Sequence, residues 1–85
     1  MSPLKDEIRR VFDEVWHHEK AGRAPVLSDE TILLESGLDS LGFAIFVSSL
    51  EEALGYDPFT LSEDAYYPQT FEEFVAFYER YRPNA

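Results

Sequence analysis

The stretch from Leu34 to Leu54, LESGLDSLGFAIFVSSLEEAL, decides the fold. After a glycine-containing turn it passes through Asp39 and Ser40, residue types favoured at helix N-caps because their side-chain oxygens accept hydrogen bonds from unpaired backbone N–H groups. Apolar residues then recur at helical spacing, and Gly55 follows the last of them, where glycine readily takes the left-handed conformation that ends a helix. The pattern predicts a loop followed by a helix over about residues 40–54.

The sequence before this stretch predicts a first helix over about residues 3–18. Ser2 and Pro3 suit a helix start, with serine as the cap and proline at the first helical position. Apolar residues from Leu4 to Trp16 then repeat every three or four positions, which gives one apolar stripe with charged residues mostly on the other side.

Residues 21–38 form a long connection between these two helices. We expect Val26 and Leu27 to anchor it. We also expect the Ser28-Asp29-Glu30 segment to cap one short turn that carries three apolar residues, Ile32-Leu33-Leu34. A loop this long in a small domain usually has a function or buried anchors.

The sequence after residue 54 predicts one short helix and one longer helix. Regular structure should break at Pro58, and the segment 62–65 favours a very short third helix that ends before Pro68. Thr70 and Glu73 then fit a capping box at the start of a fourth, aromatic-rich helix that ends before Pro83.

These elements predict an all-α fold: a small four-helix bundle over a single domain, residues 1–85, with three main helices, a short third helix and a long first loop. The predicted core residues are Ile8, Phe12, Val15, Leu34, Phe46, Val47, Leu50, Leu54, Phe74, Val75 and Tyr78.

The chain is strongly acidic, with 17 Asp and Glu against 7 Lys and Arg, a formal net charge of −10. Such a surface repels nucleic acid and anionic membranes and suits basic patches on partner proteins. Cysteine is absent, which excludes disulfides and thiolate metal sites. No apolar run approaches transmembrane length and the N-terminal segment lacks a signal peptide's apolar stretch, so we expect a cytoplasmic monomer with no membrane insertion.

The run Gly37-Leu38-Asp39-Ser40-Leu41 resembles the attachment motif of the acyl carrier proteins, and the long first loop and helix order fit that family. The resemblance implies that Ser40, flanked by Asp39 and Leu41, carries 4'-phosphopantetheine through a phosphodiester. It also implies that the arm's thiol holds an acyl group as a thioester. A phosphate ester on Ser40 would lie at the positive end of a helix dipole, which favours it.

The resemblance further implies a non-catalytic, phosphopantetheine-modified protein that presents acyl groups to enzymes of fatty acid and lipid biosynthesis, polyketide or other specialised acyl metabolism. The implied partners are a phosphopantetheinyl transferase, an acyl-loading ligase or acyltransferase, and downstream synthase enzymes with basic and apolar docking patches. An acyl chain could be stored between the helices, or aromatic residues could fill that space. The aromatic residues concerned are Trp16, Phe43, Phe46, Phe59, Tyr66 and Tyr67.

The sequence departs from the fatty-acid carriers on the helix face that meets partner enzymes. Those carriers have acidic residues two and five positions after the modified serine, where this chain has Gly42 and Ile45. We therefore expect a dedicated carrier whose docking surface has an apolar centre at Leu41 and Ile45, room for close approach at Gly42, and steering charges at Glu51 and Glu52.

Other functions compete with this interpretation. A serine hydrolase is not expected, because Ser40 lacks the G-x-S-x-G elbow and its preceding strand. A metal site is not expected, because the adjacent His17 and His18 point about 100° apart on a helix. An aminoacyl or peptidyl carrier with the same arm stays open, although Asp39 argues mildly against a peptidyl carrier. An unmodified acidic protein-interaction domain of the same fold also stays open.

Overall fold

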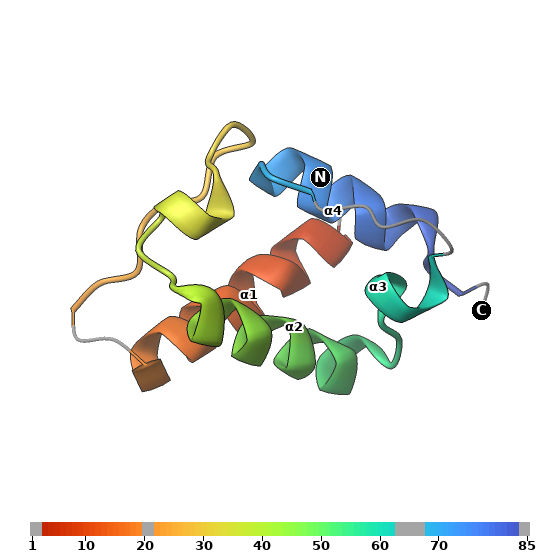
Figure 1. Cartoon of the computed structure of the whole chain (residues 1–85), viewed down its shortest axis with the longest axis horizontal. Helices are drawn as coiled ribbons and strands as arrows, with labels where there is room; N and C mark the ends of the chain where they lie inside the picture. The colour runs from red at the N-terminus through yellow and green to blue at the C-terminus, as the bar shows by residue number, and fades with distance from the viewer. Residues whose placement is uncertain (1–2, 20–21, 63–67, 84–85) are drawn as a thin grey trace.

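The computed structural model describes residues 3–19, 22–62 and 68–83. Its helices are, in chain order, α1 (Pro3–Glu19), η1 (Leu33–Glu35, a single 3-10 turn), α2 (Ser40–Leu54), α3 (Pro58–Leu61) and α4 (Phe71–Arg80). Figure 1 shows α2 and α4 along opposite sides of the view with α1 between them, α3 at one end and the long first loop at the other. This arrangement confirms the predicted all-α fold with three long helices and one short helix.

The first helix supplies one wall of the core. α1 begins at Pro3, as predicted, and its apolar stripe is buried while the opposite face carries the charges. It packs against both α2 and α4. The buried residues of the stripe are Leu4, Ile8, Val11, Phe12 and Val15.

The three long helices meet at Phe46 of α2, which is completely buried. Its ring contacts Phe12 of α1 edge-on, with 5.5 Å between ring centroids, and stacks on Phe74 of α4 at 5.3 Å. Aromatic rings bury a large apolar area each and gain further energy from edge-to-face and offset-stacked pairs. This aromatic contact therefore fixes how the three helices pack.

The ends of α4 are tied by side chains. At its start the Thr70 hydroxyl accepts a hydrogen bond from the Glu73 N–H at 3.1 Å, and the Glu73 carboxylate accepts one from the Thr70 N–H at 3.0 Å. This confirms the predicted capping box. Near its end the Tyr56 hydroxyl donates to the Tyr78 carbonyl oxygen at 2.7 Å, and such last-turn carbonyls have no partner within the helix.

The prediction for the segment after α2 is wrong at Pro58. Pro58 does not break regular structure; it is the first residue of α3, where proline's missing N–H is no loss. Asp57 caps this short helix by accepting a hydrogen bond from the Phe59 N–H at 2.9 Å. Ser62 follows α3 in an extended conformation, and the helix predicted over 62–65 otherwise lies outside the described residues, as do Tyr66 and Tyr67.

The first loop is held to the start of α4 by backbone hydrogen bonds. The Leu33 N–H donates to the Gln69 oxygen at 3.0 Å, and the Phe71 N–H donates to the Thr31 oxygen at 2.8 Å. Between these bonds, Ile32 and Thr70 form an isolated antiparallel bridge. A sequence pattern does not predict such pairing, because the paired residues are almost forty positions apart.

This pairing corrects the prediction that residues 28–30 cap the short turn. Ser28 instead closes a separate turn with Thr31, in which the Thr31 N–H donates to the Ser28 oxygen at 3.1 Å. The 3-10 turn η1 follows Ile32, which makes no side-chain cap bond. The loop is therefore held by its backbone pairing with residues 69–71 rather than by a side-chain cap.

One predicted core residue, Leu34, and one predicted loop anchor, Val26, are exposed. Leu34 is 58% exposed, whereas its neighbour Leu33 is buried, because the backbone pairing turns Leu33 toward the core. Val26 is 90% exposed, whereas Leu27, the other predicted anchor, is buried. Most of the other predicted core residues are buried, while Val47 and Leu54 are partly buried against the core. Buried residues that the prediction missed are Leu4, Val11, Leu33, Leu38, Tyr56, Phe71 and Phe77.

Candidate functional site

Ser40 is the first residue of α2 and is exposed to solvent. Asp39 is the N-cap, as predicted: its Oδ1 accepts a hydrogen bond from the Gly42 N–H at 2.8 Å, and its backbone oxygen accepts one from the Phe43 N–H at 2.8 Å. These bonds fix the first turn and leave the Ser40 hydroxyl at the positive end of a 15-residue helix. A phosphate ester on this hydroxyl would be stabilised by the dipole and by first-turn N–H groups.

Two apolar contacts hold the loop before Ser40 in place. Leu38 is completely buried, which fixes the chain one residue before the cap. Gly37 has a φ of +112°, and a Cβ at this position would lie 2.8 Å from Cη2 of Trp16 on α1. The sequence pattern did not predict these roles of Leu38 and Trp16. An apolar residue directly before an N-cap is a known signal of a fixed helix entry, and Leu38 has that position.

Gly42 has a role different from the one predicted. It is buried, and a Cβ at this position would lie 2.8 Å from Cδ1 of Leu38 and 3.2 Å from Oδ1 of Asp39. The space left by its missing side chain is therefore occupied by the chain's own loop. Room for close approach was predicted at Gly42, whereas Leu38 and Asp39 occupy the space beside it.

Ser40 differs from the other serines that the structure describes. The Ser36 hydroxyl donates to the Leu33 oxygen at 2.6 Å, and the Ser28 hydroxyl is hydrogen-bonded to the Thr31 hydroxyl at 2.9 Å. Ser48 and Ser49 lie inside α2, and Ser62 follows α3. Of the described serines, Ser40 is the one that begins a helix.

The family comparison matches this region. Residues 6–66 match the model of a family described as the phosphopantetheine attachment site. The chain belongs to this family. Searches of curated proteins and of solved structures gave no significant match.

Membership in the phosphopantetheine attachment site family establishes the general role of the chain. Members are carrier domains rather than enzymes, and they bear 4'-phosphopantetheine covalently on a serine. They interact with phosphopantetheinyl transferases and with synthase enzymes. The all-α arrangement of the chain is consistent with the acyl-carrier type of bundle.

The predicted docking residues of this carrier lie on α2 in different environments. Leu41 is 67% exposed directly beside Ser40, and Glu51 and Glu52 are exposed further along the helix. Ile45 is half-buried and packs against the core, at the edge of a shallow groove between α1 and α2. Among the predicted apolar docking residues, Leu41 is thus the most accessible.

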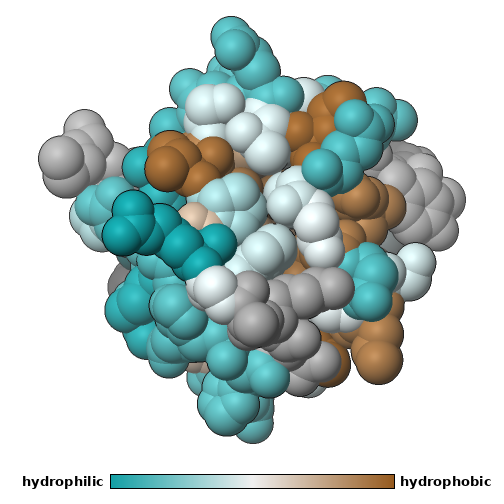
Figure 2. Space-filling model, turned by 90° about the vertical axis from the view of Figure 1, so that its left-hand side faces the viewer, coloured by the Kyte–Doolittle hydropathy of each residue, from teal (hydrophilic) through white to brown (hydrophobic). Residues whose placement is uncertain are grey.

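Apolar surface is unevenly distributed around this end of the carrier. In Figure 2 hydrophobic residues lie mainly in the upper and right-hand parts of the view, while hydrophilic residues cover the left and lower parts. The exposed large apolar residues closest to Ser40 in the sequence are Leu34 and Leu41, one on each side of it.

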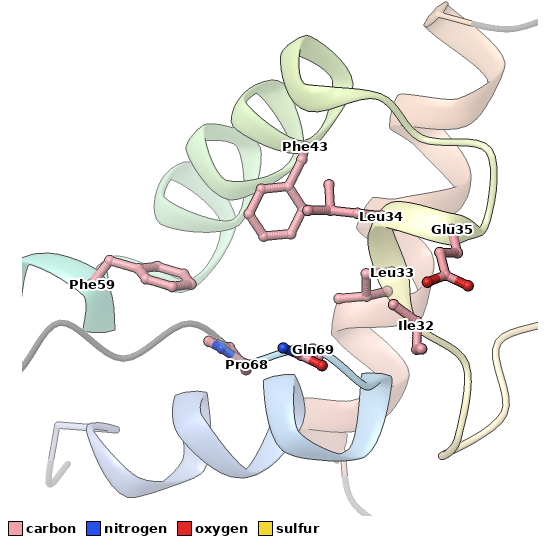
Figure 3. A pocket seen from close by; sticks show the side chains of 8 residues that line it. All are labelled: Ile32, Leu33, Leu34, Glu35, Phe43, Phe59, Pro68 and Gln69. Atoms are coloured by element: carbon pink, nitrogen blue, oxygen red, sulfur yellow. The ribbon is translucent and has the colours of Figure 1, made fainter.

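A cavity of about 370 Å³ opens beside the first turn of α2. Its walls come from η1, from Phe43 of α2, from Phe59 of α3 and from Gln69 before α4 (Figure 3). Both phenylalanines were expected from the sequence as candidates to fill the interior. The sequence pattern did not predict the cavity, because its walls come from four separate segments.

Two further findings concern the described residues as a whole. Within residues 3–19, 22–62 and 68–83, no helix is long and apolar enough to cross a membrane. In the same residues no group of three His, Asp or Glu side chains is placed to hold a metal ion. His17 and His18 are exposed near the end of α1.

Proposed function

We propose that the chain is an acyl carrier in which Ser40 is the serine that bears 4'-phosphopantetheine through a phosphodiester. When bound, the arm supplies a thiol that holds an acyl group as a thioester. The observation that carries the proposal is the placement of Ser40: exposed, first in α2, within the Gly37–Leu41 motif and inside the matched residues 6–66. The residues that would hold the arm's phosphate in place are Ser40 itself and the capped first turn that Asp39 fixes.

An intact-mass measurement tests the attachment site. Co-expression with a phosphopantetheinyl transferase should add the mass of one arm to the chain, and Ser40→Ala should abolish the addition. Ser48→Ala is the matched control, because it removes an exposed hydroxyl two turns further along the same helix. If the unchanged chain never gains the arm, or if Ser40→Ala still gains it, the assignment of Ser40 fails.

The same measurement separates the carrier from an unmodified interaction domain of the same fold. An unmodified domain would gain no mass, and its biological activity would survive Ser40→Ala. Loading assays with candidate ligases then distinguish an acyl cargo from an aminoacyl or peptidyl cargo, because each ligase activates one class of acid.

We further propose that the carrier serves a dedicated set of enzymes rather than general fatty acid synthesis. The positions two and five residues after Ser40 are Gly42, which is buried, and Ile45, which is half-buried, so neither offers an acidic contact. The proposed partners are a phosphopantetheinyl transferase, an acyl-loading ligase or acyltransferase, and downstream synthase enzymes. We still expect the carrier to be a monomer that consists of one domain over residues 1–85. We also expect it to be located in the cytoplasm.

Leu41 is the proposed apolar centre of the docking surface. Leu41→Glu should lower kcat/KM for arm transfer on the order of tenfold, the effect of about 1.4 kcal/mol of lost binding, without changing the melting temperature. Val26→Glu is the control, since Val26 is even more exposed and lies in the first loop away from α2. Ile45→Glu should lower the melting temperature as well, because Ile45 packs against the core. Unchanged transfer to Leu41→Glu would contradict the docking proposal.

A further inference from the structure

An open groove runs between α1 and α2. The two helices are antiparallel: Trp16, near the end of α1, lies against Gly37 just before α2, and Phe12 packs on Phe46 further along (Figure 1). Among the described residues, only α1 and α2 supply the lining of the groove, so α4 packs on α1 elsewhere. A groove between two packed helices is the kind of surface onto which the side chains of a third helix fit.

The floor of the groove is apolar. Val11 and Val15 of α1 line it and are buried, and Ile45 of α2 lines it and is half-buried. Ser49 and Ala53 continue the α2 wall at intervals of four residues, which places them on the same side of the helix as Ile45. An apolar side chain of a partner would therefore exchange water for apolar contacts in this floor.

The two flanks of the groove are acidic. Glu14 on the α1 flank and Glu52 on the α2 flank are both exposed. Arg10 also lines the groove, but its guanidinium pairs with the carboxylates of both Glu7 and Glu14. Three carboxylates against one guanidinium leave two negative charges uncompensated. Because exposed ion pairs contribute little, Glu14 can exchange its contact with Arg10 for a cation of a partner.

The position of the groove leaves the proposed attachment site accessible. On α2 the lining runs from Ile45 to Ala53, which follow Ser40 by five and thirteen positions. The groove thus begins roughly 7 Å from Ser40 along the helix axis and extends to about 20 Å from it. Leu41 precedes Ile45 by four positions, so the groove continues the proposed docking surface at Leu41 along one side of α2.

We propose that the groove between α1 and α2 is the docking site for an amphipathic helix of a partner enzyme. The apolar stripe of that helix fills the floor, and its Lys or Arg side chains on both flanks pair with Glu14 and Glu52. The proposal rests on the proposed function and deepens it, because it names the chemistry of the segment by which an enzyme holds the carrier. The docking surface extends along the α1 side of α2, and a helix seated there leaves Ser40 uncovered.

A designed peptide tests the chemistry of the occupant. The probe is a helix of about four turns with leucine on one stripe and lysine on both flanks, cross-linked between turns because short isolated helices are marginal in water. Added to the isotope-labelled chain without its arm, it should shift the amide NMR signals of Ile45, Ser49 and Ala53 more than those of Leu34 and Leu61, which lie outside the groove. A peptide of the same composition, scrambled so that its leucines no longer share a face, should bind about tenfold more weakly. Equal binding of the two peptides, or the largest shifts at Leu34 and Leu61, would overturn the proposal.

A matched pair of variants tests the groove itself. Ala53 and Ala44 are both exposed, but of the two only Ala53 lines the groove. They are nine positions apart, about two and a half turns, so they lie on opposite sides of α2. Ala53→Arg should weaken binding of the peptide about tenfold, because its side chain enters the groove and repels the lysines. Ala44→Arg adds the same charge and should change binding by no more than about twofold. Equal losses in the two variants would contradict the assignment of the groove.

Isosteric variants test the acidic flanks without changing the packing. Glu14→Gln, Glu52→Gln should weaken binding of the peptide about tenfold at low salt, whereas Asp6→Asn, Asp13→Asn removes two exposed charges of α1 outside the groove and should have a smaller effect. Equal losses would show that net charge alone attracts the peptide and would overturn the proposal. These measurements use the chain without its arm, so their failure leaves the assignment of Ser40 intact. A chain that gains no mass with a phosphopantetheinyl transferase would instead refute the proposed function.

Discussion

Gly37 meets two constraints that a residue with a side chain cannot meet together. Its φ of +112° lies in a region that side chains disfavour, and the space where a Cβ would stand is taken by the indole of Trp16. This contact places the loop that ends at Ser40 directly on α1. The position of the proposed attachment site thus depends on the absence of a Cβ atom at Gly37.

Gly37→Ala should lower the free energy of unfolding by about 1–3 kcal/mol, the cost of a strained backbone, plus the cost of displacing Trp16. In a domain of this size that is a fall in melting temperature of roughly 4–8 °C per kcal/mol. Gly22→Ala is the matched control, because Gly22 has a φ of +93° and nothing within 4 Å of its would-be Cβ. Thermal unfolding checks the prediction, and equal losses in the two variants would show that the Trp16 contact contributes nothing.

The buried hydroxyl groups of Tyr78 and Tyr56 differ in their hydrogen bonding. The Tyr78 side chain is completely buried, and its hydroxyl has no hydrogen-bond partner among the residues that the structure describes. Burial raises the pKa of this hydroxyl well above its ordinary value. The Tyr56 hydroxyl donates to the Tyr78 carbonyl oxygen. A buried group without a partner loses its hydration and gains nothing in return.

Tyr78→Phe should therefore raise the free energy of unfolding by about 1 kcal/mol, because it removes the unpaired hydroxyl and keeps the ring. Tyr56→Phe should lower it by a similar amount, because it leaves the Tyr78 carbonyl unpaired. Urea unfolding of the two variants gives the comparison, and a loss of stability in Tyr78→Phe would show that its hydroxyl has a partner.

At the scale of secondary-structure elements, capping residues rather than the length of the apolar repeat determine where the helices begin and end. Asp39, Asp57 and Thr70 each accept a backbone hydrogen bond at the start of a helix, and Gly55 ends α2 in the left-handed conformation with a φ of 85°. Asp39, Thr70 and Gly55 could be identified from local sequence, because capping involves neighbours within three or four positions, whereas the cap at Asp57 was not predicted.

The capping box of α4 makes a pH-dependent contribution to stability. Hydrogen bonds from the backbone N–H groups of Thr70 and Gln69 lower the pKa of Glu73 below its ordinary value of about 4.5. The folded state therefore favours the ionised carboxylate. Its contribution is complete above the ordinary pKa and is lost as the pH falls through the lowered pKa of the folded state.

Glu73→Gln should thus lower the melting temperature at pH 7, and the difference from the unchanged chain should shrink below about pH 4.5. Glu72→Gln is the control, because it removes an equal charge from the first turn of α4 and Glu72 takes no part in the capping box. Thermal unfolding between pH 7 and pH 3 provides the measurement. A difference that grows at acid pH would contradict the sign of the pKa shift.

At the scale of the whole molecule, the net charge affects association with partner proteins rather than the fold. The net charge of −10 is spread over exposed side chains, whereas no charged residue is buried among those that the structure describes. Such a surface attracts a basic partner over distances limited by salt screening, about 10 Å at 0.1 M. Rim charges of this kind change association rates more than they change the bound state.

The double variant Glu51→Gln, Glu52→Gln should lower kcat/KM for arm transfer several-fold at low salt and approach the unchanged chain near 1 M salt. Asp6→Asn, Asp13→Asn removes two exposed charges from α1 and should have a smaller effect at every salt concentration. Steady-state kinetics over a salt series checks this. Equal losses in the two double variants would mean that only net charge matters.

The sequence alone determined what depends on neighbours along the chain. Helical spacing and caps placed α1, α2 and α4 within a few residues of their observed ends, and the motif around Ser40 indicated the carrier family that the match over residues 6–66 then established. These features are local because capping, turns and apolar stripes involve residues no more than one or two helical turns apart.

Only the tertiary structure decided which side chains of the loop face the core. The backbone pairing between residues 31–33 and 69–71 buries Leu33 and exposes Leu34, and a one-residue shift of this kind is invisible in a run of three apolar residues. The same pairing places η1 and Gln69 side by side in the wall of one cavity. Long-range contacts set these features, and the packed position of each segment depends on all the others.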